Sequence, residues 1–410
     1  MLSKSLKGLR ILSALHDRDY RLFWIAMALS TAGQTLWRGT QGWLIVTLTS
    51  SPFLLGLAGF MSMVPSLVLS LFAGVIIDRK DKRLILLLTQ IGFGISVLVL
   101  GSLISLGIVE VLHVLAIALV VGVNIAFFFP SRQAIVPEML PEAKVPNGIA
   151  LNSSGFYIAM IAGSATLGWL IHQVGMDGSF YIAGIAFALG IFFLMAVRHR
   201  SESSNQAKAY PFWKDLKRAL SYTQSNHLVF ALLMVTGVTS LLRGSPLTLM
   251  PIFAKDILET GATGLGYLLA ANSVGALLGT ILLASIGNYR AKGTLILIAF
   301  FAEGLGQIVF GSSRNMSLSL TVLLLHGAAS GISITALVTT IQLNTPNELR
   351  GRVMGLYFLV FQGIIPIGAL LSGTLANFTN ASFATVSTGA AMCIVTAIFT
   401  LGVPVIRKAR

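Results

Sequence analysis

The sequence predicts an all-α polytopic membrane protein, with twelve transmembrane helices in two pseudo-symmetric six-helix bundles around a central cavity. Three observations lead to this prediction. Hydrophobic residues make up 55% of the 410 residues, charged residues only 10%, and the mean hydropathy is +0.85. Apolar runs long enough to cross a bilayer recur along the whole chain. Short patterns in the first half of the chain also recur in the second half.

The apolar runs divide the chain into three parts. The first bundle is expected over residues 1–197, and the second over residues 227–410. A polar stretch at 198–226 separates them and is expected to be a cytoplasmic linker with an amphipathic helix. The twelve predicted spans are, in order, 20–47, 52–77, 84–107, 111–136, 146–173, 178–197, 227–254, 262–287, 291–312, 316–343, 350–377 and 381–405.

The positive charge of the chain is distributed according to this topology. The net charge is +14, and with a cytoplasmic N-terminus the inner segments hold 24 of the 28 Lys and Arg residues. The predicted outer loops hold only Lys255 and Arg314. This asymmetry follows the positive-inside rule and predicts that both termini are cytoplasmic. The positive charge is therefore explained by the membrane topology and by contact with anionic lipid. We expect no nucleic-acid partner.

Two arginines lie inside apolar spans, at corresponding places in the two halves. Arg38 precedes Gly39 in the first span, and Arg243 precedes Gly244 in the seventh, 205 residues later. An arginine at membrane depth costs a few kcal/mol or more, so it is rarely kept without a partner or a function. We expect both to line the cavity and to bind an anionic or oxygen-rich substrate. The structural alternative is that each pairs with a buried acid or with backbone carbonyls.

Further correspondences support a duplication. The segment 54–57 resembles 264–267, and the loop 76–83 resembles 286–293, both at an offset of 210; the segment 135–140 resembles 344–349 at an offset of 209. Together with the Arg38 and Arg243 pair, these make four correspondences in the same order, which predict two related halves. This is an architecture of secondary transporters, which bind substrate near the midplane between their halves.

The loop after the second span carries the most specific pattern, Gly74-Val-Ile-Ile-Asp78-Arg79-Lys-Asp-Lys82-Arg83. It resembles the Gly-x-x-x-Asp-Arg-x-x-Arg/Lys-Arg/Lys loop of the major facilitator superfamily. Four other segments resemble the branch that contains the enterobactin exporter and macrolide efflux proteins. They are His16–Trp24, Thr49–Gly56, Ser131–Pro137 and Leu349–Gly355 with its continuation to Gly373.

The resemblance implies a secondary transporter that works by alternating access. It also implies that Gly74, Asp78, Arg79, Lys82 and Arg83 form a conformational latch, in which Gly74 lets two helices approach closely. A basic loop that only sets topology is the alternative. The second copy has Asn288 in place of the acid and Ala284 in place of the glycine, so the latch of the first half is expected to dominate.

One acid and one histidine lie deep inside the second half. Glu303 is nine residues from the outer end of its span, and His326 is ten residues from the outer start of the next. At about 1.5 Å per residue both lie at a similar depth, so the two side chains can meet. Carboxylates and imidazoles exchange protons, and we expect this pair to couple transport to protons. Alternatively, Glu303 holds an arginine in a fixed ion pair and His326 fills a polar gap.

The other polar side chains inside the spans are candidates for hydrogen bonds to substrate. We expect Gln41, Asn124 and Gln362 to contact substrate together with Arg38 and Arg243. Each of the three amides can equally tie two helices together. The single cysteine, Cys393, excludes an intrachain disulfide.

The predicted function is a proton-coupled secondary transporter, expected to be an antiporter, that exports a siderophore or a drug across a bacterial-type inner membrane. A lipid or lysolipid flippase, or an uptake facilitator of the same fold, is the alternative. No nucleophile–base pair, phosphate-binding glycine loop or metal-ligand spacing indicates an enzyme. We expect no cofactor or metal, with the proton gradient as the energy source. The expected partners are a small-molecule substrate and membrane lipids, and the chain is expected to be a monomer.

Overall fold

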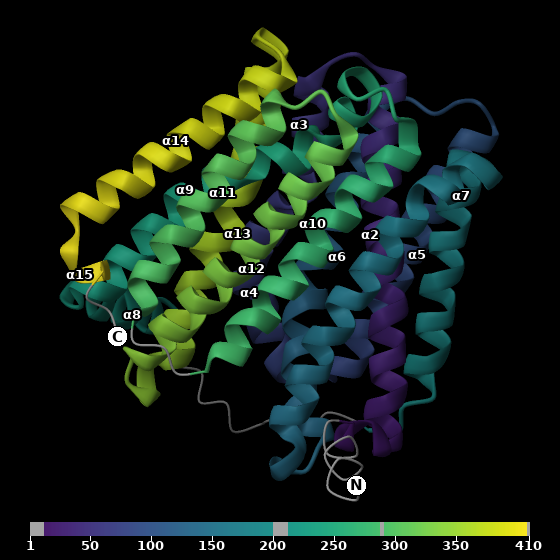
Figure 1. Ribbon diagram of the computed structural model, residues 1–410. Helices are drawn as coiled ribbons and strands as arrows, with labels where there is room; N and C mark the ends of the chain where they lie inside the picture. The colour runs from purple at the N-terminus through teal and green to yellow at the C-terminus, as the bar shows by residue number, and fades with distance from the viewer. Residues whose placement is uncertain (1–11, 200–211, 288–290, 408–410) are drawn as a thin grey trace, which may run out of the picture. The chain divides into compact units, whose positions relative to one another are not determined.

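The computed structural model describes residues 12–199, 212–287 and 291–407 (Figure 1). Within these ranges the chain is helical and contains no strand, which confirms the predicted all-α class. Ten helical segments of the described chain are long and apolar enough to cross a membrane, so the protein is a multi-pass membrane protein. Contacts divide the chain into unit 1, Met1–Leu44 with Met61–Ala207, and unit 2, Ile45–Phe60 with Lys208–Arg410.

The helices of the first half follow the predicted spans with two interruptions. They are η1 (Ser13–His16), α2 (Arg18–Leu48), α3 (Pro52–Met61), α4 (Val64–Arg79), α5 (Lys82–Ser105), α6 (Val111–Met139), η2 (Glu142–Lys144) and α7 (Val145–Met195). The span predicted at 52–77 is broken between α3 and α4. Pro65 lies in the first turn of α4, and it favours a break or kink here because it has no N–H and its ring clashes with the carbonyl four residues before it.

The second interruption is a glycine inside α7. This element covers both spans predicted at 146–173 and 178–197, and Gly175 within it has φ 76° and ψ 177°. Only glycine adopts such a backbone conformation at no steric cost, so the chain reverses here between two helices. One straight helix of this length would be about 75 Å long, more than twice the hydrocarbon thickness.

The helices of the second half match the predicted spans one by one. They are α8 (Phe212–Ser225), α9 (His227–Ile252), the π-helical turn η3 (Phe253–Ile257), α10 (Gly261–Ile286), α11 (Lys292–Ser312), α12 (Met316–Leu343), α13 (Asn347–Phe378), α14 (Ala381–Gly402) and α15 (Pro404–Arg407). The predicted linker helix is present as α8. The side chains of residues 212–216, in its first turns, lie outside the described residues.

Unit 1 has an aromatic core between three of its helices. The ring of Phe93 in α5 stacks on Phe187 in α7 at 5.4 Å between centroids and meets Phe128 in α6 edge-on at 5.6 Å. At the other end of the unit, the Tyr20 hydroxyl donates to the Gly148 carbonyl at 2.6 Å. Such contacts hold α2 and α5 against α7.

Unit 2 is built on a close approach of α10 and α12, which run side by side (Figure 1). Gly275 and Gly279 of α10 meet Gly327 and Gly331 of α12 across this contact. A Cβ atom added at any of the four would clash with a backbone oxygen of the opposite helix. Two Gly-x-x-x-Gly motifs therefore bring the two backbones together, as small residues do in membrane helices. The sequence reading did not single out this pair of motifs.

Candidate functional site

A buried ion pair in unit 2 joins α9 and α11. Arg243 donates from Nε to Glu303 Oε2 at 2.8 Å and from Nη2 to Glu303 Oε1 at 2.8 Å. The Glu303 side chain is fully buried, and that of Arg243 is 8% exposed. A bidentate pair of this kind is among the strongest hydrogen-bonded arrangements in proteins. In this structure the Glu303 carboxylate is therefore paired with an arginine.

Three further side chains complete the surroundings of the pair. The Ser333 hydroxyl of α12 donates to Glu303 Oε1 at 2.7 Å and accepts from Arg243 Nη2 at 3.0 Å. The Arg243 guanidinium carbon also lies 5.6 Å from the ring centre of Phe300 and 5.7 Å from that of Phe361. The two rings attract the cation and keep water away from it. The charge of Arg243 is thus balanced within unit 2.

His326 is not a partner of Glu303. Its Nδ1 lies 3.1 Å from Asn272 Oδ1 of α10, and its Nε2 has no hydrogen-bond partner in the described part of the chain. A Cβ at Gly306 would lie 3.1 Å from His326 Cβ, so the histidine is level with Gly306. Gly306 is about one helical turn from Glu303 in α11. The expectation that the two side chains meet is therefore wrong, because equal depth was estimated only to within a turn.

Arg38 has the opposite environment from Arg243. Its side chain is exposed, although it lies inside the long helix α2, and no ion pair or hydrogen bond joins it to any described residue. Lipid would be an expensive neighbour for an unpaired guanidinium, so its exposed surface fits a water-filled path. The two arginines correspond in sequence, but only Arg38 is free to bind a ligand without breaking an existing pair.

Two buried N–H donors lie within one turn of Arg38. Trp37 Nε1 and Gln41 Nε2 have no hydrogen-bond acceptor among the described residues, and both side chains are 5% exposed or less. A buried donor without an acceptor costs free energy, so these two groups are strained sites within α2.

The other two amides expected to bind substrate differ from each other. Asn124 donates from Nδ2 to the Val120 carbonyl of its own helix at 3.1 Å and packs against Gly92 of α5. It therefore has a structural contact within unit 1. Gln362 of α13 is exposed, and no hydrogen bond joins it to another described residue.

The residues of the expected latch make contacts within unit 1. Lys82 Nζ lies 2.8 Å from Glu138 Oε1 at the end of α6. Arg83 donates to the carbonyls of Leu194 and Met195 at the end of α7, at 3.0 and 2.7 Å. Cations at these positions stabilise helix C-termini.

The remaining members of the latch are less constrained. A Cβ at Gly74 would meet nothing within 4 Å. The expectation that this glycine allows close helix packing is therefore wrong for this structure. The Arg79 side chain is exposed at the end of α4, and the side chain of Asp78 lies outside the described residues.

The sequence reading missed a polar centre in unit 1. Arg132 was counted among the inner basic residues, yet it is 4% exposed inside α6. It donates to Thr31 Oγ1 at 2.9 Å and to Asn152 Oδ1 at 3.1 Å, and it lies over the Phe156 ring. The available signal was its place inside an apolar run, with Asn152 following in the next predicted span.

Comparison with known proteins identifies the family. Residues 10–409 match the model of the transmembrane secretion effector family. The chain is 24% identical to the multidrug efflux pump Tap of Mycolicibacterium fortuitum, over 82% of this chain and 83% of that protein. It is 23% identical to the staphyloferrin A transporter of Staphylococcus aureus, over 83% of this chain and 86% of that protein.

Solved structures support the same fold. The nucleoside transporter NupG superposes with a TM-score of 0.74 at 12% identity, over 93% of this chain and 98% of that one. The inward-open xylose transporter XylE of E. coli superposes with a TM-score of 0.68 at 12% identity, over 96% of each chain. These likenesses show the fold alone, whereas the family match covers nearly the whole sequence. The chain belongs to the transmembrane secretion effector family of the major facilitator superfamily, and is a membrane transporter, not an enzyme.

Proposed function

We propose that this transporter exports a small organic molecule in exchange for protons, and that Glu303 is the proton-binding group. The similar proteins named efflux pumps and the staphyloferrin A transporter support small-molecule transport. The proposed setting is a bacterial inner membrane with both termini in the cytoplasm, as the positive-inside distribution indicates. The single observation that carries the proposal is the buried Arg243–Glu303 pair.

The pair suits proton coupling because the Glu303 carboxylate can be neutralised either by the Arg243 guanidinium or by a proton. A deprotonated Glu303 neutralises Arg243 through two hydrogen bonds of 2.8 Å. A protonated Glu303 leaves an uncompensated cation, held only by Ser333 and the rings of Phe300 and Phe361. Each uptake of a proton therefore places a positive charge on unit 2. Because a buried unpaired charge is unstable, protonation favours a different arrangement of the helices around Arg243.

The sign of this linkage limits the substrate. In an exchanger, substrate must bind best when Glu303 is deprotonated and paired with Arg243. A cationic substrate, or an uncharged one that leaves the pair closed, satisfies this condition. An anion would instead bind best to Arg243 after Glu303 takes up a proton. Anion and proton would then move across the membrane together, in the same direction. Exchange through this pair thus fits an uncharged or cationic molecule.

The donors around Arg38 indicate which atoms of such a molecule are recognised. Arg38 is exposed and unpaired, and Trp37 Nε1 and Gln41 Nε2 lack acceptors among the described residues. Hydroxyl, ether and carbonyl oxygens fit these groups as acceptors. We therefore propose an oxygen-rich lipophilic substrate, bound through unit 1 while unit 2 carries the proton.

The proposal is tested with everted membrane vesicles in which a proton gradient is imposed. The probes are erythromycin, which is uncharged at high pH and rich in oxygens, and ethidium, which is a cation. We expect the gradient to drive the movement of at least one probe in wild type and to have no effect in Glu303→Gln. Uptake into vesicles that is equal with and without the gradient in wild type would refute proton exchange.

Arg38→Gln is expected to weaken transport without loss of folded protein. A charge-assisted hydrogen bond contributes about 1.5–3 kcal/mol, so the half-saturating substrate concentration should rise roughly 10- to 100-fold. Because Arg38 bonds to no described residue, the melting temperature should stay within about 2 °C of wild type. The measurement is transport kinetics alongside thermal unfolding, with Arg38→Lys as the variant that keeps the charge. Unchanged kinetics in Arg38→Gln would remove Arg38 from the substrate site.

A further inference from the structure

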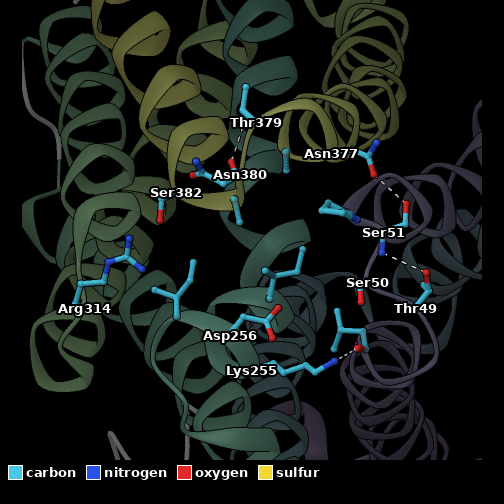
Figure 2. A pocket seen from close by; sticks show the side chains of 16 residues that line it. Thr49, Ser50, Ser51, Lys255, Asp256, Arg314, Asn377, Thr379, Asn380 and Ser382 are labelled. Carbon is cyan, nitrogen blue, oxygen red and sulfur yellow. Dashed lines mark hydrogen bonds between the residues drawn. The ribbon is translucent and has the colours of Figure 1, made fainter.

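A second polar site lies in unit 2, away from the Arg243–Glu303 pair. It is a pocket of about 460 Å³ where four stretches of chain meet (Figure 2). The stretches are 46–52 at the junction of α2 and α3, 252–257 after α9, Arg314 before α12, and 376–382 between α13 and α14. The volume suits a small molecule. No role proposed above uses this pocket.

The basic residues of the pocket are the first argument for an anionic ligand. Lys255 and Arg314 are the two Lys and Arg residues of the predicted outer loops, and both line the pocket. Arg314 is exposed and has no hydrogen bond or ion pair with any described residue. The Lys255 ammonium donates to the Val46 carbonyl near the end of α2, which fixes its position without neutralising its charge (Figure 2).

Helix geometry adds to this positive field. The 22-residue helix α14 begins at Ala381, and Ala381 and Ser382 of its first turn line the pocket. The Asn380 side chain accepts from the Phe383 N–H at 2.8 Å, so it orders this helix start. The helix α3 also begins at the pocket, with Pro52. Helix N-termini carry a partial positive charge and bind oxyanions.

The remaining polar groups describe the rest of the ligand. Asp256 is the one acidic side chain that lines the pocket, and it forms no ion pair with Lys255 or Arg314 in the described chain. Hydroxyl and amide groups line the rest of the pocket, on Thr49, Ser50, Ser51, Asn377, Thr379, Asn380 and Ser382 (Figure 2). Asp256 accepts hydrogen bonds from hydroxyl or amine donors, whereas the two cations bind an acidic group.

We propose that this pocket binds the carboxylate or phosphate group of a small polar molecule, with Arg314 and Lys255 as the cationic ligands. The positive-inside distribution predicts that the pocket faces the outside of the cell. The site is independent of Glu303, so it stands or falls separately from proton exchange. A free carboxylate and a phospholipid headgroup share the same chemistry, and the experiment separates them.

The first arm of the experiment measures the electrostatic potential of the pocket. A cysteine is introduced as Ser382→Cys, or as Ser50→Cys if the first variant does not fold, in a Cys393→Ala background. Membrane-impermeant thiol reagents of opposite charge are applied to intact cells, and Ile108→Cys, on an exposed predicted outer loop of unit 1, serves as reference. We expect the ratio of anionic to cationic reaction rates to exceed that at the reference cysteine. Arg314→Gln should lower the ratio at least about threefold, and Arg218→Gln on α8 should not.

The second arm identifies the ligand chemistry in protein reconstituted into nanodiscs of zwitterionic lipid. Succinate and inorganic phosphate, each at constant ionic strength, should slow labelling of the pocket cysteine at least about twofold at millimolar concentration. Arg314→Gln should abolish this protection. Protection by phosphatidylglycerol nanodiscs, without any added anion, would assign the site to a lipid headgroup. A rate ratio equal to the reference, or no protection by any of these anions, would overturn the proposal.

Discussion

Replacing Glu303 by leucine should destabilise the protein by about 3–5 kcal/mol, because it leaves the buried charge of Arg243 without its partner. The carboxylate supplies both of the 2.8 Å hydrogen bonds that the guanidinium makes to an acid. Ser333 and the two phenylalanine rings remain, but they carry no negative charge. The free energy of unfolding, measured by denaturant titration in detergent, should fall by this amount.

The matched control removes both charges at once. The double variant Arg243→Met/Glu303→Leu replaces the ion pair by apolar side chains of similar length. Such replacements are often neutral or stabilising, so the double variant should recover most of the lost stability. A double-mutant cycle then gives the coupling energy of the pair. If both single variants were as stable as wild type, the pair would not hold α9 to α11.

The second large effect is expected at the glycines between α10 and α12. Gly275→Ala combined with Gly279→Ala places methyl groups against the backbone oxygens of Leu324 and Ala328, so the two helices must separate. Overpacking costs about 1–3 kcal/mol per site, which gives an expected loss of about 2–6 kcal/mol for the double variant. Thermal unfolding of the purified protein in detergent measures this loss.

The control for this prediction is a glycine with open space around it. A Cβ at Gly355 of α13 meets nothing within 4 Å, so Gly355→Ala should be neutral or stabilise the protein by up to about 1 kcal/mol through helix propensity. The contrast separates steric overlap from propensity, since both variants make the same chemical change. Equal melting temperatures for wild type and Gly275→Ala/Gly279→Ala would contradict the close packing of α10 and α12.

The helices were predictable because apolar run length sets where a membrane helix begins and ends. The breaks inside these helices depend on the backbone properties of single proline and glycine residues, which a hydropathy average does not take into account. Pro65 divides one predicted span into α3 and α4. Gly175, with its non-helical backbone angles, separates the two predicted spans within α7. Both residues were visible in the sequence, but neither changes the hydropathy that defined the spans.

The polar sites were predicted only in part. The duplication predicted that Arg38 and Arg243 occupy corresponding positions, and it also suggested equal environments. The two environments differ because Glu303 has no counterpart in the first half. Subtracting the offsets of 205 to 210 residues from 303 gives positions 93–98, and this segment contains no acidic residue. Which side chains meet depends on rotation about each helix axis, and this cannot be obtained from depth. The serine that bonds Glu303 was therefore not foreseen.

The most direct test of the proposed coupling is the number of protons released when substrate binds. Purified protein in weakly buffered detergent solution is mixed with saturating erythromycin or ethidium, whichever of the two is transported, and the pH change is recorded. Proton release is expected from wild type and none from Glu303→Gln, measured at a concentration that saturates the variant. Its affinity for substrate should be lower, because glutamine mimics the protonated acid. Equal proton release from both proteins would contradict the assignment of the proton to Glu303.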